Sequence, residues 1–204
     1  MASRLSIVLA TRNPGKIREI RAILGDLAVD LLTADDFPQV GPVVEDGLTF
    51  EANAVTKAAY IREHTGLVSL ADDSGLEVDA LGGRPGILSA RFAGDKASYA
   101  DNNRKLLDLL RDVPFEQRTA RFVCVAALAV PGGDVMLKRG EVEGLITDTA
   151  AGGGGFGYDP IFYVPAYGKT VAQLDDATKN RISHRAKAFR AMAGVIGDLL
   201  KGGR

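Results

Sequence analysis

The sequence predicts an α/β fold in which a mixed β-sheet is flanked by helices. Short apolar runs bounded by turn residues are typical of buried strands, and they lie between longer segments whose apolar residues recur at helical spacing. The strands and helices intermix without strict alternation, which favours a mixed sheet. No repeat, low-complexity tract or long linker divides the chain, so we expect residues 1–204 to form a single domain with room for two lobes.

In the first part of the chain, these signals place the following elements: strand Ser6–Ala10, loop Thr11–Lys16, a helix with Ile17, Ile20, Ile23 and Leu24 on one face, strand Val29–Leu32, loop Gly41–Gly47, a helix from Thr49 to about His64, and strand Leu67–Ala71. Thr49 is a suitable N-cap for its helix, and Gly66 is a suitable end. The strand at Leu67–Ala71 is expected to end in a loop at Asp72–Gly75.

In the second part, the expected elements are a helix from about Tyr99 to Arg111 with Leu106, Leu107 and Leu110 inward, strand Arg121–Val130, a turn at Pro131–Asp134, strands Val135–Arg139 and Glu141–Thr147, loop Gly152–Asp159, strand Ile161–Val164, and a helix from about His184 to Lys201. The run Arg121–Val130 is the strongest strand signal in the chain.

Composition and charge argue against several classes of protein. The chain is 46% hydrophobic and 25% charged, as in an average soluble globular protein, and its net charge of −1 does not favour nucleic acid or an anionic membrane as a partner. No apolar run approaches the ~18 residues that span a bilayer. The apolar stretch in Met1–Ala10 is too short for a signal peptide. The single cysteine, Cys124, is expected to be buried, and the cytoplasm is the expected location.

The first candidate binding region is the loop Thr11–Lys16, which joins a predicted strand to a predicted helix. Its proline and glycine favour a tight turn, and the start of the helix presents free backbone N–H groups beside Lys16, which suits a phosphate. The loop lacks the glycine spacing of a Walker A motif, which argues against a P-loop ATPase. An ordinary strand–helix connection is the alternative interpretation.

The second candidate region contains two adjacent aspartates, Asp72 and Asp73. At the end of a buried strand, their carboxylates repel each other and lose hydration. A positive charge nearby would offset both costs. Because successive side chains of an extended backbone point to opposite faces, we expect only one of them to face the site. With Glu45 from an earlier loop, this inventory suits Mg²⁺, whereas the scarcity of histidine (His64 and His184) argues against zinc. A common turn is the alternative interpretation.

The third candidate region is the loop Gly152–Asp159, followed by Thr178–Arg185. Phe156 and Tyr158 place aromatic rings in a glycine-rich loop, where such a ring can stack on a base, and Asp159 can accept a hydrogen bond from a base N–H. The alternative is a linker whose aromatic residues anchor it in the core.

Ser183, His184 and Arg185 open the last predicted helix, with Ser183 as a natural N-cap. Capping by Ser183 leaves His184 and Arg185 in the first turn, where cations oppose the helix dipole. An anionic or carbonyl-bearing ligand would offset that cost. A solvated polar start of a helix is the alternative.

Taken together, these regions resemble the inosine triphosphate pyrophosphatase family, over essentially the whole chain. The stretches that carry the resemblance, in the family's order, are Ala10–Lys16, Glu45–Phe50, Ala71–Leu76, Gly154–Phe162 and Ser183–Arg185. The resemblance implies an elongated mixed sheet flanked by helices, with two lobes around a central cleft, and a homodimer. It also implies Mg²⁺-dependent hydrolysis of ITP, dITP and XTP to the monophosphate and pyrophosphate, sparing ATP and GTP and removing the non-canonical purine nucleotides from the pool.

The resemblance also assigns roles to individual residues. Asp73 would be the catalytic base that accepts a proton from the attacking water, and Glu45 and Asp73 would hold the metal. The substrate would be bound by Thr11, Arg12, Asn13, Pro14, Gly15, Lys16, Lys57, Ser74, Phe156, Gly157, Tyr158, Asp159, Lys179, His184 and Arg185. Phe156 would stack on the purine. A donor such as Arg185 would meet the 6-oxo group, so Arg185→Ala is expected to weaken ITP turnover far more than stability.

Three other functions stay open at the level of the sequence. The chain could be a related pyrophosphatase that prefers pyrimidine or modified bases, or a nucleotide-binding regulatory module without turnover. A nucleic-acid-binding role would depend on the basic residues Lys179, Arg181, Arg185, Lys187 and Arg190 alone, and the net charge argues against it.

Overall fold

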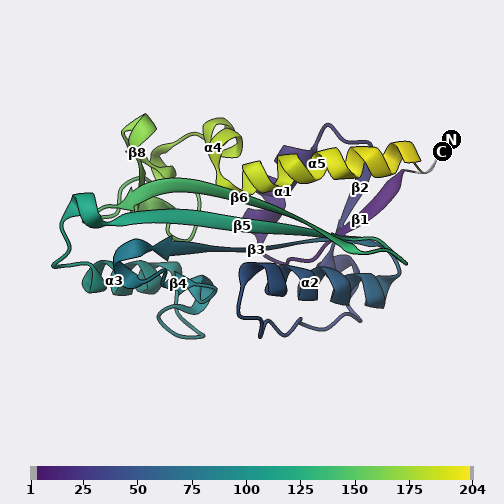
Figure 1. Ribbon diagram of the computed structural model, residues 1–204, viewed down its shortest axis with the longest axis horizontal. Helices are drawn as coiled ribbons and strands as arrows, with labels where there is room; N and C mark the ends of the chain where they lie inside the picture. The colour runs from purple at the N-terminus through teal and green to yellow at the C-terminus, as the bar shows by residue number, and fades with distance from the viewer. Residues whose placement is uncertain (1–3, 203–204) are drawn as a thin grey trace. The chain divides into compact units, whose positions relative to one another are not determined.

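A mixed eight-stranded β-sheet organises residues 4–202, which are the residues that the computed structural model describes (Figure 1). The strands are β1 (Leu5–Leu9), β2 (Val29–Thr33), β3 (Val68–Val78), β4 (Pro85–Gly86), β5 (Thr119–Ala129), β6 (Val135–Ile146), β7 (Phe162–Val164) and β8 (Lys169–Thr170). Their order is β2-β1-β3-β5-β6-β7-β8, with β4 paired to β3. The α-helices are α1 (Pro14–Leu24), α2 (Phe50–Thr65), α3 (Tyr99–Leu109), α4 (Asp176–Ile182) and α5 (His184–Gly202). The predicted α/β class is therefore confirmed.

The described residues divide into two compact units. The first unit holds the chain up to Asp73, the segment Cys124–Gly140 and the chain from Arg185 onward; the second unit holds Ser74–Val123 and Glu141–His184. Strands β3, β5 and β6 each contribute residues to both units. That residues 1–204 form a single domain stays a prediction.

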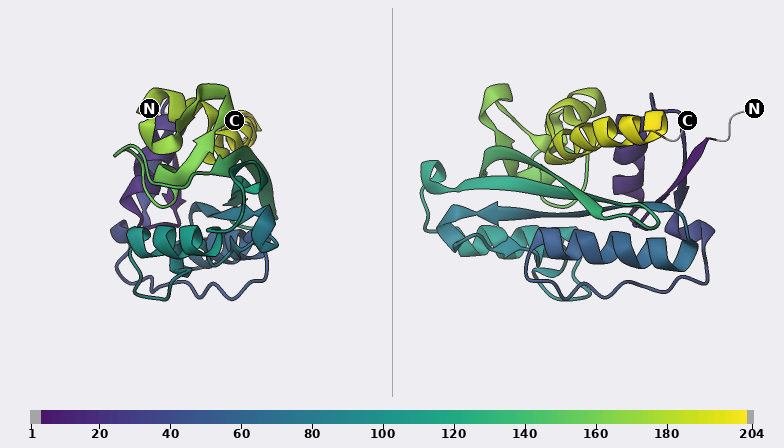
Figure 2. Two further views of the ribbon diagram at one scale, coloured as in Figure 1. Left: turned by 90° about the vertical axis from the view of Figure 1, so that its left-hand side faces the viewer. Right: turned by 45° about the vertical axis from the view of Figure 1, so that its right-hand side comes forward.

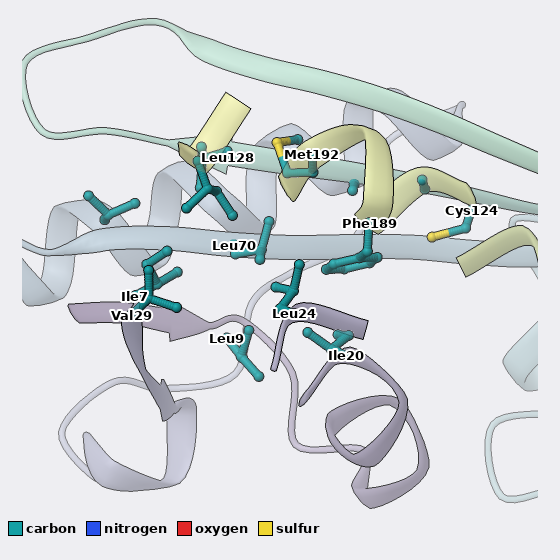
Figure 3. Packing of buried hydrophobic residues seen from close by; sticks show 14 residues of the cluster. Ile7, Leu9, Ile20, Leu24, Val29, Leu70, Cys124, Leu128, Phe189 and Met192 are labelled. Atoms are coloured by element: carbon teal, nitrogen blue, oxygen red, sulfur yellow. The ribbon is translucent and has the colours of Figure 1, made fainter. Parts of the chain in front are cut away.

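In the first unit, helices cover both faces of the strands. Strand β1 pairs in parallel with β2 on one side and with β3 on the other. Ile20 and Leu24 of α1 share one buried cluster with Leu70 of β3 and with Phe189 and Met192 of α5 (Figure 3). Helix α2 lies on the face of the strands opposite to α1 and α5 (Figures 1 and 2).

The ends of the first unit's helices follow from local sequence. The side chain of Asn13 accepts hydrogen bonds from the backbone N–H groups of the first turn of α1, and Pro14 occupies the first helical position. Thr49 caps α2 through the N–H of Ala52, and Gly66 ends α2 with a φ of 69°, a left-handed conformation that glycine adopts without strain. These boundaries confirm the prediction for the α2 segment.

The second unit has its own buried cluster. Leu106 of α3 and Leu110, which directly follows that helix, are fully buried in a cluster with Leu76 of β3, Phe122 of β5 and Phe162 of β7. Strands β6, β7 and β8 pair antiparallel in sequence, so the short strands β7 and β8 extend the sheet beyond β6. The predicted helix from about Tyr99 and the predicted strand ending at Val164 are both present.

Two predicted boundaries are wrong. Strand β3 continues through Asp72–Gly75 instead of ending there, because the two aspartates find basic partners inside the fold and need no loop to reach water. Strand β6 is continuous where two strands were expected, because sheet pairing overrides the weak strand preference of Gly140. The sequence reasoning also missed α4, β4 and β8, which are the shortest elements of their kinds.

The structure also bears on the sequence-based expectations about burial and membranes. Cys124 is fully buried, as predicted. Within residues 4–202, none of the helices combines the length and apolar character needed to cross a bilayer. The prediction for Met1–Ala10 falls partly on residues 1–3, which lie outside the described residues.

Candidate functional site

The structure divides the predicted site residues between the two units. The first unit holds Thr11–Lys16, Glu45, Lys57, Asp73 and Arg185. The second unit holds Ser74, Phe156–Asp159, Lys179 and His184. Each unit therefore carries its own polar group, and the neighbours His184 and Arg185 belong to different units.

The segment Thr11–Lys16 was predicted to be a loop, but α1 already begins at Pro14 because Asn13 caps it, and the segment is held by hydrogen bonds among its own residues. The Oδ1 of Asn13 accepts from the N–H groups of Gly15 (2.9 Å) and Lys16 (3.2 Å), and the N–H of Asn13 donates to the hydroxyl of Thr11 (3.2 Å). Arg12 is directed elsewhere: its Nε donates to Asp35 (3.0 Å) and its terminal nitrogen to the carbonyl of Val40 (2.9 Å). The loop is thus fixed in shape at the start of α1.

Lys16 belongs to a buried network of charges. Its Nζ lies 2.9 Å from Asp72, whose side chain is completely buried. Asp72 also pairs with Arg185 (3.3 Å), and Arg185 pairs with Glu19 at 2.5 Å. The Arg185 side chain is only 2% exposed. Burial alone would lower the pKa of Arg185, but Asp72 and Glu19 raise it above the ordinary value, so the guanidinium is charged.

A second network in the first unit surrounds Lys57 of α2. Its Nζ lies 2.7 Å from the carboxylate of Asp73 and 2.9 Å from that of Glu45, so one ammonium group joins the two predicted metal ligands. The amide of Asn53, one turn earlier on α2, donates to Asp73 (3.3 Å) and accepts from the N–H of Gly47 (2.9 Å). Asn53 therefore holds the loop that carries Glu45.

Asp72 and Asp73 have separate sets of partners, as the alternation of side chains along a strand predicts. Asp72 pairs with Lys16 and Arg185, whereas Asp73 pairs with Lys57 and Asn53. The two carboxylates thus serve different networks from neighbouring positions of β3.

The titration of Asp73 and Lys57 reflects their burial. Burial raises the pKa of Asp73 above the usual value for an aspartate, and the charges of Lys57 and Lys16 act in the opposite direction. Burial alone would lower the pKa of Lys57, but the carboxylates of Asp73, Asp72 and Glu45 raise it. A carboxylate with a raised pKa is a better proton acceptor than an ordinary aspartate.

In the second unit, Asp159, Lys179 and Phe156 form a tight group. The carboxylate of Asp159 accepts from the ammonium of Lys179 (2.7 Å) and from the N–H of Phe156 (2.8 Å). The Lys179 ammonium also lies 4.8 Å from the centre of the Phe156 ring, within the range of a cation–π contact. Asp159 and Lys179 are buried, and the Phe156 ring is half-buried.

His184 is stacked on an aromatic ring, and Tyr158 anchors the glycine-rich loop. The His184 ring lies 4.8 Å from that of Phe122, centre to centre, with 20° between the ring planes. Both residues line a small cavity together with Asp159 and Lys179. The hydroxyl of the buried Tyr158 donates to the carbonyl of Ser89 (2.9 Å), and burial raises the pKa of Tyr158. Tyr158 is thus an anchor of the loop.

Ser74, the remaining predicted residue of the second unit, is half-buried in β3 directly after Asp73.

Sequence reasoning missed several residues that hold these groups in place. Glu19 lies three positions after Lys16 on α1 and is buried. Its place among the apolar residues of that helix was a usable signal for a buried carboxylate. Phe122 and Asn103 gave no signal, because their contacts with His184 and Gly157 join distant parts of the sequence.

Comparison with known proteins gives consistent matches over nearly the full chain. Residues 7–195 match the sequence profile of the Ham1 family. The chain is 51% identical over 191 residues to a dITP/XTP pyrophosphatase of Geobacter sulfurreducens, which covers 94% of this chain and 96% of the relative. It is 50% identical over 198 residues to a dITP/XTP pyrophosphatase of Thermus thermophilus, which covers 97% and 95%.

Solved structures agree with these matches. A HAM1 protein from Coxiella burnetii superposes with a TM-score of 0.88 at 40% identity, covering 95% of this chain and 99% of that one. A nucleoside-triphosphatase, dITP/XTP pyrophosphatase, from Mycobacterium abscessus superposes with a TM-score of 0.76 at 42% identity, covering 94% and 98%.

Proposed function

The chain belongs to the Ham1 family, and we propose that it is a pyrophosphatase that hydrolyses non-canonical purine nucleoside triphosphates to the monophosphate and pyrophosphate. The observation that carries this proposal is the Lys57 ammonium joined to the carboxylates of Glu45 and Asp73. This group supports the proposal because Asp73 is the proposed proton acceptor, Glu45 the proposed second acidic ligand and Lys57 the proposed cation for the polyphosphate.

Glu45 and Asp73 fit a Mg²⁺ ion. Their carboxylates already converge on one cation, the Lys57 ammonium, and Mg²⁺ takes one or two carboxylates together with substrate phosphates and water. When bound, Mg²⁺ would neutralise charge on the polyphosphate.

The protein's own groups would then position the reacting atoms. Lys16 and the N–H groups at the start of α1 would hold the polyphosphate, and Lys57 would neutralise its charge. Asp73, with its raised pKa, would accept a proton from the water that attacks the α-phosphorus in line with the departing pyrophosphate. Positioning and charge neutralisation supply most of the rate in such a reaction.

The polar group of the second unit would recognise the base. Phe156 offers a ring for stacking, while the Lys179 ammonium and the Asp159 carboxylate offer a donor and an acceptor for the polar edge of a purine. A 6-oxo purine presents an acceptor where adenine presents an amino group, so a donor there rejects adenine. His184, stacked on Phe122, is the further candidate donor.

The proposal includes three features of the cellular role. The enzyme acts as a homodimer, it works in the cytoplasm, where nucleoside triphosphates are consumed by polymerases, and it removes non-canonical purine nucleotides from the pool.

A substrate panel tests the proposed function. With Mg²⁺ present, we expect release of pyrophosphate from ITP and XTP with kcat/KM at least about 100-fold above that for GTP, UTP and dTTP. Excess EDTA should abolish the reaction, and added Mg²⁺ should restore it. Preference for UTP or dTTP would favour a pyrimidine-directed enzyme, and nucleotide binding without any turnover would favour a regulatory module.

Substitution of Gly155 tests the base-recognition group. Gly155 has a φ of 72°, and a Cβ at this position would overlap the carboxylate of Asp159. We therefore expect Gly155→Ala to displace Asp159 and to lower kcat/KM for ITP by about tenfold or more. The matched control is Gly153→Ala, because a Cβ at Gly153 meets no atom within 4 Å. Equal kinetics of the two variants would show that the conformation of Asp159 does not matter for turnover.

A further inference from the structure

Helix α3 presents two side chains to the loop that carries Phe156. Tyr99 and Asn103 stand four positions apart, so they lie on one face of α3. The ring of Tyr99 lies 6.2 Å from that of Phe156, centre to centre, with 39° between the planes. The Nδ2 of Asn103 donates to the carbonyl of Gly157 at 3.1 Å. One helix face thus contacts two consecutive residues of the loop.

The hydrogen bond from Asn103 fixes the point at which the loop turns. Gly157 has a φ of 65°, a left-handed conformation that glycine adopts readily, and because glycine can adopt many others, a hydrogen bond to its carbonyl helps to hold this one. Phe156 precedes this residue and Tyr158 follows it. Tyr158 is anchored through Ser89 and the N–H of Phe156 donates to Asp159, so the Asn103 contact adds a further fixed point at the residue that follows Phe156.

Asn102, the neighbour of Asn103 on α3, is an example of an asparagine whose hydrogen bonds are purely structural. The amide of Asn102 uses both ends, accepting from the N–H of Ala93 (2.7 Å) and donating to the carbonyl of Ala90 (3.2 Å). The Oδ1 of Asn103, in contrast, is shielded from solvent and accepts no hydrogen bond from the described residues. A buried acceptor without a partner costs free energy, and such costs are concentrated at functional sites.

We propose that Tyr99 and Asn103 are positioning residues that determine base selectivity, by fixing the orientation of the Phe156 ring from helix α3. This inference rests on the proposed function, because it assigns Phe156 to the base. Tyr99 contributes a second aromatic ring beside Phe156, and Asn103 holds the turn. The groups assigned to the polyphosphate belong to the first unit, whereas Tyr99 and Asn103 belong to the second.

Kinetics of an asparagine variant separate positioning from a general loss of structure. We expect Asn103→Ala to lower the ratio of kcat/KM for ITP to that for UTP by about three- to tenfold, the loss expected for one neutral hydrogen bond. Inhibition by pyrophosphate, which lacks a base, should be unchanged. Tyr99→Leu should lower the same ratio without a shift in melting temperature, because Tyr99 is 47% exposed. The matched control is Arg104→Ala, because the Arg104 side chain is 70% exposed and pairs with Asp101 on the surface.

A spectroscopic readout tests the loop without any turnover. The chain has no tryptophan, so Phe156→Trp introduces a single reporter at the stacking position. In this background, Asn103→Ala should lower the fluorescence anisotropy, whereas Arg104→Ala should leave it unchanged. If the wild-type protein hydrolyses no nucleotide, the proposed function fails while this comparison still decides whether Asn103 orders the loop.

Two outcomes would overturn the inference. One is an unchanged selectivity ratio and unchanged anisotropy in both Asn103→Ala and Tyr99→Leu. The other is a parallel fall in kcat/KM for ITP and UTP, together with a lower melting temperature, which would make Asn103 structural only.

Discussion

Replacing Asp73 by asparagine is expected to lower kcat for ITP by about 10²- to 10⁴-fold, the range that a positioned general base contributes. The fold should survive, because asparagine has the same shape and its oxygen can still accept from Lys57. The Lys57 ammonium also keeps the Glu45 carboxylate at 2.9 Å, so no buried charge is left alone. Steady-state kinetics with a melting curve of the same preparation measure both effects.

Asp46→Asn is the matched control for this experiment. Asp46 is an exposed acid beside Glu45 and undergoes the same chemical change without touching the Lys57 group. We expect its kcat to stay within about twofold of the wild type, as is usual for surface substitutions. An Asp73→Asn variant that retained more than a tenth of the wild-type kcat would remove Asp73 from the role of proton acceptor.

The fold class was predictable because local signals and the final structure agree over most elements. Thr49 and Gly66 bound α2 as their capping preferences require, and the apolar run of β5 forms the strand that it predicts. The errors fall where distant residues decide the outcome. Asp72 and Asp73 look like a turn in the sequence, but they continue β3 because Lys57 and Arg185 neutralise them within the fold.

The composition of the candidate site was predictable in part. Local sequence predicts Lys16 beside the start of a helix, and it places Phe156 in a glycine-rich loop. The pairing of Lys57 with Glu45 and Asp73 depends on contacts across 12 and 16 positions, which no local pattern reveals. The roles of these residues in catalysis stay predictions until variants are measured.

Arg185 illustrates this limit, since its position in the sequence suggested a donor to the ligand in the first turn of a helix. The structure provides the anionic partners that such a cation needs from the protein itself, because Glu19 and Asp72 lie 166 and 113 positions away in the chain. With 2% of its side chain exposed, Arg185 would have to leave two carboxylates to reach a base. The expectation that Arg185→Ala spares stability is therefore replaced by the opposite one.

Arg185→Ala is expected to destabilise the protein by about 3–5 kcal/mol, the usual cost of breaking a buried ion pair by removing one partner. For a chain of this size, 1 kcal/mol corresponds to about 2–4 °C, so the melting temperature should fall by roughly 6–20 °C. Arg185→Lys should destabilise the protein less than Arg185→Ala, because lysine keeps the positive charge and loses only the paired hydrogen-bond donors of the guanidinium group. Lys187→Ala, an exposed change on the same helix, is the control and should shift the melting temperature by about 2 °C or less.

A double-mutant cycle with Glu19→Gln identifies the physical cause of this loss. If Arg185→Ala destabilises by leaving Glu19 as an unpaired buried charge, then neutralising Glu19 should recover about 1 kcal/mol or more of the loss. Strictly additive effects would mean that Glu19 and Arg185 are not coupled. A melting temperature for Arg185→Ala close to that of Lys187→Ala, together with a large fall in ITP turnover, would return Arg185 to the base site. The network predicts the reverse, because Arg185 neutralises Asp72, and Asp72 in turn holds Lys16 at the start of α1.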